Sequence, residues 1–86
     1  DLLALGAMKA IHDCGLKPGE DILVAGHDDQ SFSSFTYPAL TTVRQPRTEI
    51  GQAAVDIIID IDQNLSAPKK YIQKTFPSTL IVRESA

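Results

Sequence analysis

The sequence Val24-Ala25-Gly26-His27-Asp28-Asp29 decides the fold of this 86-residue chain. Residues 22–25 form a short, continuous apolar run, which is typical of a strand covered on both faces, and Gly26 ends it. A helix-like segment and a turn of about six residues come before the run, and this order is typical of parallel α/β architecture. Because ligands bind outside the carboxyl ends of parallel strands, the polar residues after Gly26 are candidates for a binding site.

Two further segments have the spacing of helices. Residues 2–14 are apolar around most of the circumference, with Asp1 suited to the N-cap and Gly15 to a left-handed residue after the helix. This helix should be covered on more than one side, by its own sheet and by a partner chain, and Cys14 at its end should be buried. A second helix is predicted from Pro46 to Leu65. Its apolar residues repeat every three or four positions: Ile50, Ala53, Ala54, Ile57, Ile58, Ile61 and Leu65.

The remaining segments are loops and β-prone runs. Residues 27–41 form a long polar loop, and loops of this length are usually functional or packed on a neighbour. Residues 41–44 form a short β-prone run, and Gln45-Pro46-Arg47 after it is either a hinge or a plain helix start. Two more runs, 70–76 and 79–83, predict a hairpin, although Pro77 could equally separate strands of two sheets.

Composition and charge exclude several classes of protein. The hydrophobic content of 43% favours a folded chain over a disordered one. A net charge of -3 with scattered basic residues argues against nucleic-acid binding by these residues, and no apolar run approaches the roughly 20 residues that span a bilayer. The single Cys14 cannot form an internal disulfide, which fits a reducing compartment. The chain starts in a helix-like pattern without an initiator Met, so we expect a fragment that needs its missing neighbours or a partner for stability.

The residues His27, Asp28 and Asp29 carry the chemistry that the sequence offers. A carboxylate at a strand end can accept hydrogen bonds from the hydroxyls of a sugar, or it can cap the loop that follows, and both interpretations stay open here. A metal site is not expected, because adjacent residues point in different directions and His12 is the only other histidine. The sequence has no nucleophile elbow, phosphate-binding loop or metalloprotease motif, so we predict neither an enzyme nor a cofactor.

Six blocks of the chain resemble, in order and spacing, the LacI/GalR family of transcriptional regulators. They cover nearly the whole sequence and are Leu5-Gly6-Ala7-Met8-Lys9-Ala10, Gly15-Leu16-Lys17-Pro18, Asp21-Ile22-Leu23-Val24-Ala25-Gly26-His27-Asp28-Asp29, Pro38-Ala39-Leu40-Thr41-Thr42-Val43-Arg44-Gln45-Pro46, Gly51-Gln52-Ala53-Ala54-Val55 and Leu80-Ile81-Val82-Arg83-Glu84-Ser85. The resemblance implies an α/β fold with a parallel sheet covered by helices, as a fragment of a two-lobed periplasmic-binding-protein-like fold.

The same resemblance implies how the chain is divided. Residues 1–86 would be the C-terminal part of an effector-binding and dimerisation domain, with the effector between two lobes. Residues 1–45 and 79–86 would belong to the C-terminal lobe and residues 46–78 mostly to the N-terminal lobe. The DNA-binding headpiece would lie outside the chain.

Roles of individual residues also follow from the resemblance. Asp28 matches the family's acceptor for sugar hydroxyls or bases, and Gln45 matches a glutamine that lines the cleft. His27 replaces an aromatic residue, and Arg47 stands where some sugar-responsive members have one, so the identity of the effector stays open: Arg47 either favours an anionic ligand or is a solvated residue at a helix start. Asp1 matches the second residue of an Asn-Asp pair whose Asn contacts the ligand.

A surface for a second subunit is implied as well. Leu5 and Met8 fall on a helix that resembles the family's dimer interface, and the loop near Thr36 and Tyr37 would flank it. We therefore expect a homodimer or higher homo-oligomer, acting as a cytoplasmic transcriptional regulator or repressor that senses a sugar or small metabolite. It would contact operator DNA only through the missing headpiece, and no membrane. One alternative is a periplasmic sugar-binding protein of a transporter, and another is a small α/β enzyme that uses His27, Asp28 and Asp29.

Overall fold

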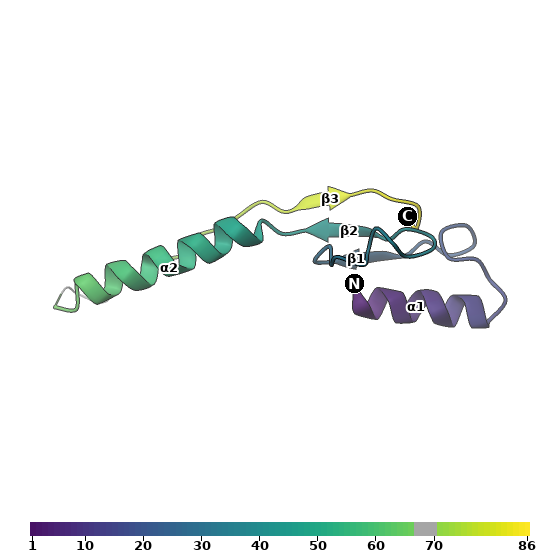
Figure 1. The fold of residues 1–86 in the computed structure, drawn as a ribbon, viewed down its shortest axis with the longest axis horizontal. Helices are drawn as coiled ribbons and strands as arrows, with labels where there is room; N and C mark the ends of the chain where they lie inside the picture. The colour runs from purple at the N-terminus through teal and green to yellow at the C-terminus, as the bar shows by residue number, and fades with distance from the viewer. Residues whose placement is uncertain (67–70) are drawn as a thin grey trace. The chain divides into compact units, whose positions relative to one another are not determined.

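The computed structural model describes residues 1–66 and 71–86, which form two helices and three strands (Figure 1). In chain order these elements are α1 (Leu2–Asp13), β1 (Ala25–His27), β2 (Thr41–Arg44), α2 (Arg47–Gln63) and β3 (Thr79–Ile81). The chain separates into two compact units: Asp1–Gln45 with Ser78–Ala86, and Pro46–Pro77. The first unit contains α1 and all three strands, and the second contains α2.

The sheet of the first unit has the strand order β1-β2-β3 and is mixed. β1 and β2 pair in parallel, with Ala25 opposite Thr41, as the sequence predicted. β3 pairs antiparallel to β2, with Thr79 opposite Arg44, so that the sheet is parallel only in part. The reason is that the chain returns at Ser78 beside the point where it left, so that β3 runs back along β2. The α/β fold class is therefore confirmed, with one antiparallel strand added.

The core of the first unit lies between α1 and the sheet, and α1 packs against β1 (Figure 1). Ala4 and Met8 of α1 are buried there with Val24 and Leu40, and Ile11 packs against them. Leu40 is fully buried although it lies in the long polar loop, because it packs in the core just before β2 begins. The loop 27–41 is thus anchored at its end by an apolar residue.

The predicted strand 22–25 differs from the observed one in position and in coverage. β1 begins at Ala25 and continues through Gly26 to His27, and Val24 just before it is buried. Leu23 is 67% exposed and Ile22 is 43% exposed, so the prediction of a strand covered on both faces is wrong for the described residues. Since α1 covers the face that contains Val24, the opposite face of this run has no cover from the described part of the chain.

The two ends of α1 also differ in how well they were predicted. Gly15 has a φ of +78°, which confirms the left-handed residue expected after the helix. Asp1 occupies the N-cap position, but its carboxylate makes no capping hydrogen bond. Cys14 is exposed, so its predicted burial is wrong: it stands one residue past the helix, beyond the core residue Ile11.

The second unit contains the predicted second helix, which spans Arg47–Gln63 with Pro46 as its N-cap rather than its first helical residue. Ala53 and Ile57 of its apolar stripe are half-buried, and the other positions of the stripe are exposed within the described residues. No helix among residues 1–66 and 71–86 is both long enough and apolar enough to cross a membrane.

The predicted hairpin is wrong in its first strand. Residues 71–78 form no strand, and residue 70 lies outside the described residues. The second predicted strand, 79–83, corresponds to β3, which is shorter and pairs with β2 instead of with residues 70–76. Pro77 stands at the boundary between the two units, and because residues 71–76 form no strand, it does not separate strands of two sheets within the described residues either.

Candidate functional site at the carboxyl ends of β1 and β2

Parallel pairing brings the carboxyl ends of β1 and β2 together, and three polar residues meet there. His27 is the last residue of β1, Asp28 follows it, and Gln45 follows β2. The Nε2 of Gln45 donates to Asp28 Oδ1 over 3.1 Å, and His27 Nδ1 lies 3.0 Å from the same oxygen. Gln45 Nε2 also lies 3.4 Å from His27 Nδ1. We call His27, Asp28 and Gln45 the polar cluster.

The polar cluster is accessible and offers both kinds of hydrogen-bonding group. The side chains of His27 and Asp28 are 57% and 49% exposed. The hydrogen bonds described for the Asp28 carboxylate fall on Oδ1, and a carboxylate has four acceptor sites in all. Gln45 adds an amide with two N–H donors and one acceptor oxygen. The arrangement suits a neutral ligand with several hydroxyl or amide groups.

The fourth residue predicted for the effector site is Arg47. It is exposed and is the first residue of α2, in the second unit. The structure thus brings His27, Asp28 and Gln45 together, and the grouping of Arg47 with them stays a prediction.

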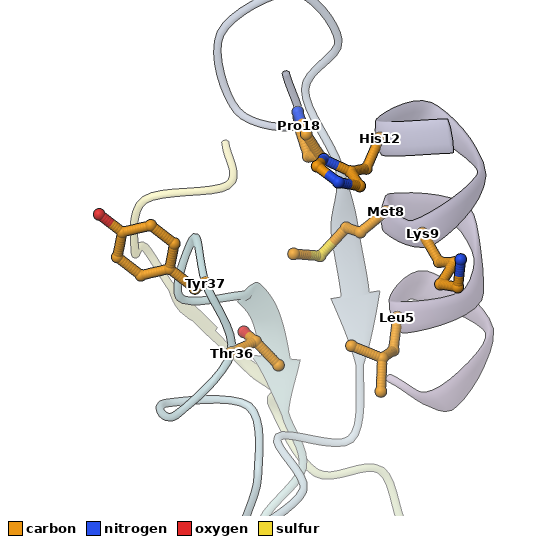
Figure 2. A pocket seen from close by; sticks show the side chains of 7 residues that line it. All are labelled: Leu5, Met8, Lys9, His12, Pro18, Thr36 and Tyr37. Atoms are coloured by element: carbon orange, nitrogen blue, oxygen red, sulfur yellow. The ribbon is translucent and has the colours of Figure 1, made fainter. Parts of the chain in front are cut away.

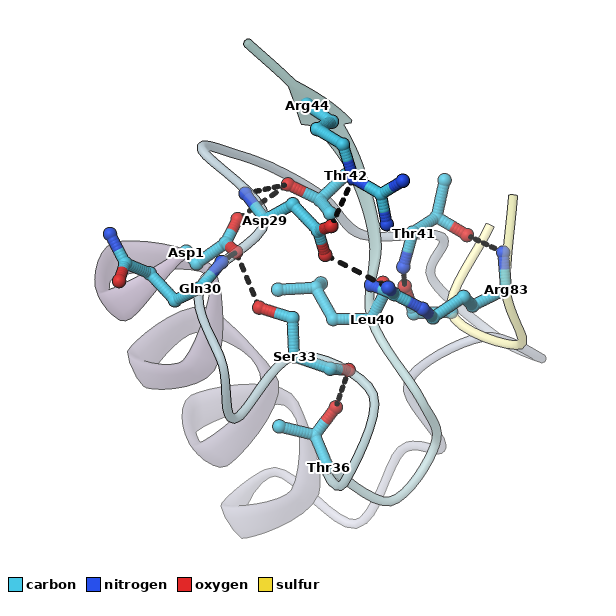
Figure 3. A network of polar contacts seen from close by, with 11 residues as sticks. Asp1, Asp29, Gln30, Ser33, Thr36, Leu40, Thr41, Thr42, Arg44 and Arg83 are labelled. Atoms are coloured by element: carbon cyan, nitrogen blue, oxygen red, sulfur yellow. Dashed lines mark hydrogen bonds and ion pairs between the residues drawn. The ribbon is translucent and has the colours of Figure 1, made fainter. Parts of the chain in front are cut away.

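Asp29, the residue after Asp28, forms ion pairs within the protein. Its carboxylate accepts from Arg44 Nε over 2.7 Å and from Arg83 Nη2 over 2.8 Å, and the Asp29 side chain is 9% exposed (Figure 3). The hydrogen bonds from Arg44 and Arg83 hold the pKa of the Asp29 carboxyl below its ordinary value. These two ion pairs are a structural role that neither interpretation of the sequence, ligand contact or loop capping, included.

A second anchoring carboxylate, that of Asp1, was missed as such by sequence reasoning. Its Oδ1 accepts from the Thr42 hydroxyl over 2.6 Å, and its Oδ2 accepts from the Gln30 backbone N–H over 2.7 Å and from the Ser33 hydroxyl (Figure 3). Gly26 permits this approach, because a Cβ at that position would collide with the Asp1 carboxylate. Its partners lie in the loop and in β2, so no local pattern could have indicated them.

The residues predicted for a subunit interface surround one cavity of about 510 Å³ on the first unit. It is lined by Leu5, Met8, Lys9, His12, Pro18, Thr36 and Tyr37 (Figure 2). Tyr37 is 97% exposed and Leu5 37%, whereas Met8 is 5% exposed and belongs mainly to the core. The Thr36 hydroxyl is held by the carbonyls of Ser33 and Pro38. All four predicted residues, Leu5, Met8, Thr36 and Tyr37, are therefore neighbours, and their contact with a partner subunit stays a prediction.

Metal binding has no support in the part of the chain that the structure describes. Within it, no group of three or more His, Cys, Asp or Glu side chains is arranged to hold an ion.

The whole chain matches one protein family. Residues 1–86 match the periplasmic binding protein-like domain. The chain is 40% identical over 85 residues to the HTH-type transcriptional regulator MalR of Streptomyces coelicolor, a match that covers 99% of this chain and 24% of that protein. It is 38% identical over 85 residues to the lactose operon repressor of Escherichia coli, which covers 99% of this chain and 23% of the repressor.

A solved structure gives the same result in three dimensions. The crystal structure of the lac repressor dimer bound to operator and the anti-inducer ONPF matches with a TM-score of 0.84 and 38% identity, over 99% of this chain and 25% of that one. This chain therefore spans about a quarter of the length of the relatives that it matches. It belongs to the periplasmic binding protein-like domain family, and its relatives there are transcriptional regulators of the LacI type.

Proposed function

We propose that this chain is the effector-binding and dimerisation segment of a LacI-type transcriptional regulator, a repressor, that senses a sugar or small metabolite. The observation that carries the proposal is the polar cluster at the joined carboxyl ends of β1 and β2, in a chain whose relatives regulate transcription. Ligands of open parallel sheets bind at such strand ends. The unit of residues 1–45 and 78–86 would come from the C-terminal lobe, and residues 46–77 from the N-terminal lobe.

Each residue of the cluster has a chemical role in this proposal. Asp28 accepts hydrogen bonds from two ligand hydroxyls, while Gln45 contributes a donor and an acceptor beside it. His27 borders the same oxygen of Asp28 and limits the size of the ligand there. Arg47 belongs to the second unit, and its contact with the effector stays a prediction from the resemblance.

Effector binding would be coupled to DNA binding through a change in conformation. A ligand that fits one arrangement of the two lobes better than the other increases the population of that arrangement. The difference in affinity between the two states sets how strongly operator binding responds. The solved lac repressor dimer has both operator and anti-inducer bound, which supports the same two-site scheme here. Operator contacts would come from a headpiece outside residues 1–86, since these carry a net charge of -3. A regulator that binds operator DNA acts where the DNA is, so we also propose a cytoplasmic location.

A binding protein of a transporter is not favoured, because the relatives reported above are transcriptional regulators. An enzyme is not favoured for the same reason. Mass spectrometry and N-terminal sequencing of the native protein distinguish a transcriptional regulator from the binding protein of a transporter. We expect a longer chain with a helix-turn-helix segment, and a cleaved secretory leader without such a segment would overturn the proposal.

The effector site is tested by Asp28→Ala in the intact protein. Titration calorimetry is run with a panel of pentoses, hexoses and disaccharides, and the variant is compared with wild type for each sugar that binds. Loss of the charged acceptor should weaken binding by about 2–3 kcal/mol, which is roughly 30- to 150-fold in Kd. Asp13→Ala is the matched control, because Asp13 is an exposed carboxylate on α1 paired with Lys9. Equal affinities of the Asp28→Ala protein and wild type would refute the assignment of Asp28.

A further inference from the structure

The residues next to Asp28 and Gln45 in the chain belong to an ion-pair network that is not part of the proposed effector site. Asp29 Oδ2 accepts from Arg44 Nε over 2.7 Å, and Asp29 Oδ1 accepts from Arg83 Nη2 over 2.8 Å. Figure 3 shows these two arginines converging on the Asp29 carboxylate from β2 and from the segment after β3. We call Asp29, Arg44 and Arg83 the arginine clamp.

One end of the clamp is fixed in the core. The Arg83 side chain is 17% exposed, and its Nη1 donates to the carbonyl of Leu40 over 2.9 Å. Its backbone N–H donates to the Thr41 hydroxyl over 2.8 Å. Because Leu40 is fully buried, the guanidinium is tied to a rigid part of the unit. A planar guanidinium can bind both Leu40 and Asp29 at once, which a lysine ammonium does with far less directional control.

The other end of the clamp is joined directly to the polar cluster. Asp29 follows Asp28, and Arg44 precedes Gln45, so the 2.7 Å ion pair links the immediate neighbours of the two cluster residues. That ion pair lies beside the 3.1 Å hydrogen bond between Gln45 Nε2 and Asp28 Oδ1. The separation of the two effector-facing side chains therefore depends on the separation of their clamped neighbours.

The backbone at Asp28 needs such support. Asp28 has a φ of 105° and Asp29 a φ of 49°, and both values lie in the region that residues other than glycine seldom adopt. Conformations of this kind persist where the surrounding contacts hold them. Here the Asp28 N–H donates to the Val43 carbonyl over 2.8 Å, and the Asp29 N–H donates to the Thr42 hydroxyl over 3.3 Å. The arginine clamp adds contacts to the Asp29 side chain, from Arg44 and Arg83.

We propose that Asp29, through Arg83 and Arg44, is a positioning residue that fixes Asp28 and Gln45 in the geometry that binds the effector. This inference rests on the proposed function of Asp28 and Gln45 as effector contacts. Asp29 itself touches no ligand, because its carboxylate is occupied by the two arginines and is 9% exposed. Weakening the clamp loosens the cluster and lowers effector affinity without removing a contact to the effector.

The test uses crystal structures of the intact protein as wild type, Asp29→Asn and Arg44→Ala. Asparagine keeps one acceptor oxygen but presents an NH₂ group to one of the two arginines, so one arm of the clamp is lost. We expect the Asp28 Oδ1 to Gln45 Nε2 separation to exceed the 3.5 Å limit of a hydrogen bond, or Asp28 to adopt a second conformer. Arg44→Ala removes the half-exposed arm and decides the question if Asp29→Asn does not fold.

The matched control is Val24→Ala, which destabilises the core of the same unit without touching the clamp. An unchanged Asp28–Gln45 geometry in both clamp variants would overturn the proposal, as would the same displacement in Val24→Ala. Calorimetry with galactose, ribose and maltose follows, and any of these sugars that binds wild type should bind Asp29→Asn about tenfold more weakly. The Val24→Ala protein should bind it as wild type does. If Asp28→Ala leaves sugar affinity unchanged, the proposed function fails, and the clamp is then judged by the crystal geometry alone.

Discussion

Replacement of Ser85 by alanine should destabilise the first unit strongly for the loss of one oxygen atom, because two buried hydrogen bonds are lost with it. Ser85 is fully buried, and its hydroxyl donates to the Val24 carbonyl over 2.7 Å. The same oxygen accepts from the Thr41 N–H over 2.8 Å. One side chain thus joins the residue before β1 to the first residue of β2.

The magnitude follows from the two backbone groups that Ser85→Ala leaves behind. The Val24 carbonyl and the Thr41 N–H would each lose a partner in a buried setting, at a cost of about 1–3 kcal/mol per group. Removing the hydroxyl also relieves its own desolvation and leaves a methyl group in an apolar place, which offsets about 1 kcal/mol. A net loss of about 1–5 kcal/mol remains, with a middle value of about 2–3 kcal/mol.

Hydrogen exchange of the Thr41 amide measures this loss at the site itself, without requiring that the whole protein unfold in one step. Opening that costs about 2 kcal/mol less should accelerate exchange of this amide by roughly 30-fold under conditions where exchange reports the opening equilibrium. Ser34→Ala is the matched control, because Ser34 is exposed in the loop and should leave the rate unchanged. If Thr41 keeps its wild-type protection in Ser85→Ala, the reasoning about orphaned backbone groups is refuted.

Three further predictions concern pH, assembly and packing. Because the folded-state pKa of Asp29 lies below its unfolded value, its stabilisation is complete at neutral pH and is lost on acidification below about pH 5, so urea midpoints should fall less with acid in Asp29→Asn than in wild type. Leu5→Arg should dissociate the proposed dimer in sedimentation velocity by burying an unpaired charge, while Leu3→Arg, at a position 91% exposed, should not; a dimer in both would remove the interface. Gly26→Ala should lower the unfolding free energy by about 1–3 kcal/mol through a clash with Asp1, whereas Gly6→Ala, with no atom within 4 Å, should raise it by about 0.5–1 kcal/mol; thermal melts showing equal shifts would contradict this.

Elements with strong local patterns were predictable from the sequence. Helix α1, strand β2 and helix α2 were placed nearly to their observed ends, because apolar spacing, Gly15 and Pro46 are all local signals. The errors fell where burial depends on distant neighbours. Cys14 is exposed, and the face of the chain around Leu23 is uncovered, since no local pattern tells which elements will cover a residue.

The residues of the polar cluster were predictable from the sequence, but the contacts that hold them in place were not. His27, Asp28 and Gln45 stand at strand ends, and the parallel pairing that unites them follows from the α/β order of elements. The contacts that hold them join positions far apart in the chain, such as Asp29 with Arg83 and Asp1 with Thr42. Nothing in the local sequence distinguishes Arg83 from an exposed basic residue, because its partner Asp29 lies 54 positions away in the chain.

The adjacent carboxylates Asp28 and Asp29 illustrate how one strand end can serve two purposes. Two ionised carboxylates so close together repel each other unless positive charge lies near them. Arg44 and Arg83 supply two positive charges against the single charge of Asp29, so the clamp carries an excess of one positive charge beside Asp28. This positive charge, held by the residue that follows Asp28 in the chain, partly offsets the repulsion between the two carboxylates. Asp29 therefore has two effects: its ion pairs hold the backbone at the end of β1, and its two arginines leave one net positive charge next to the carboxylate that we propose contacts the ligand.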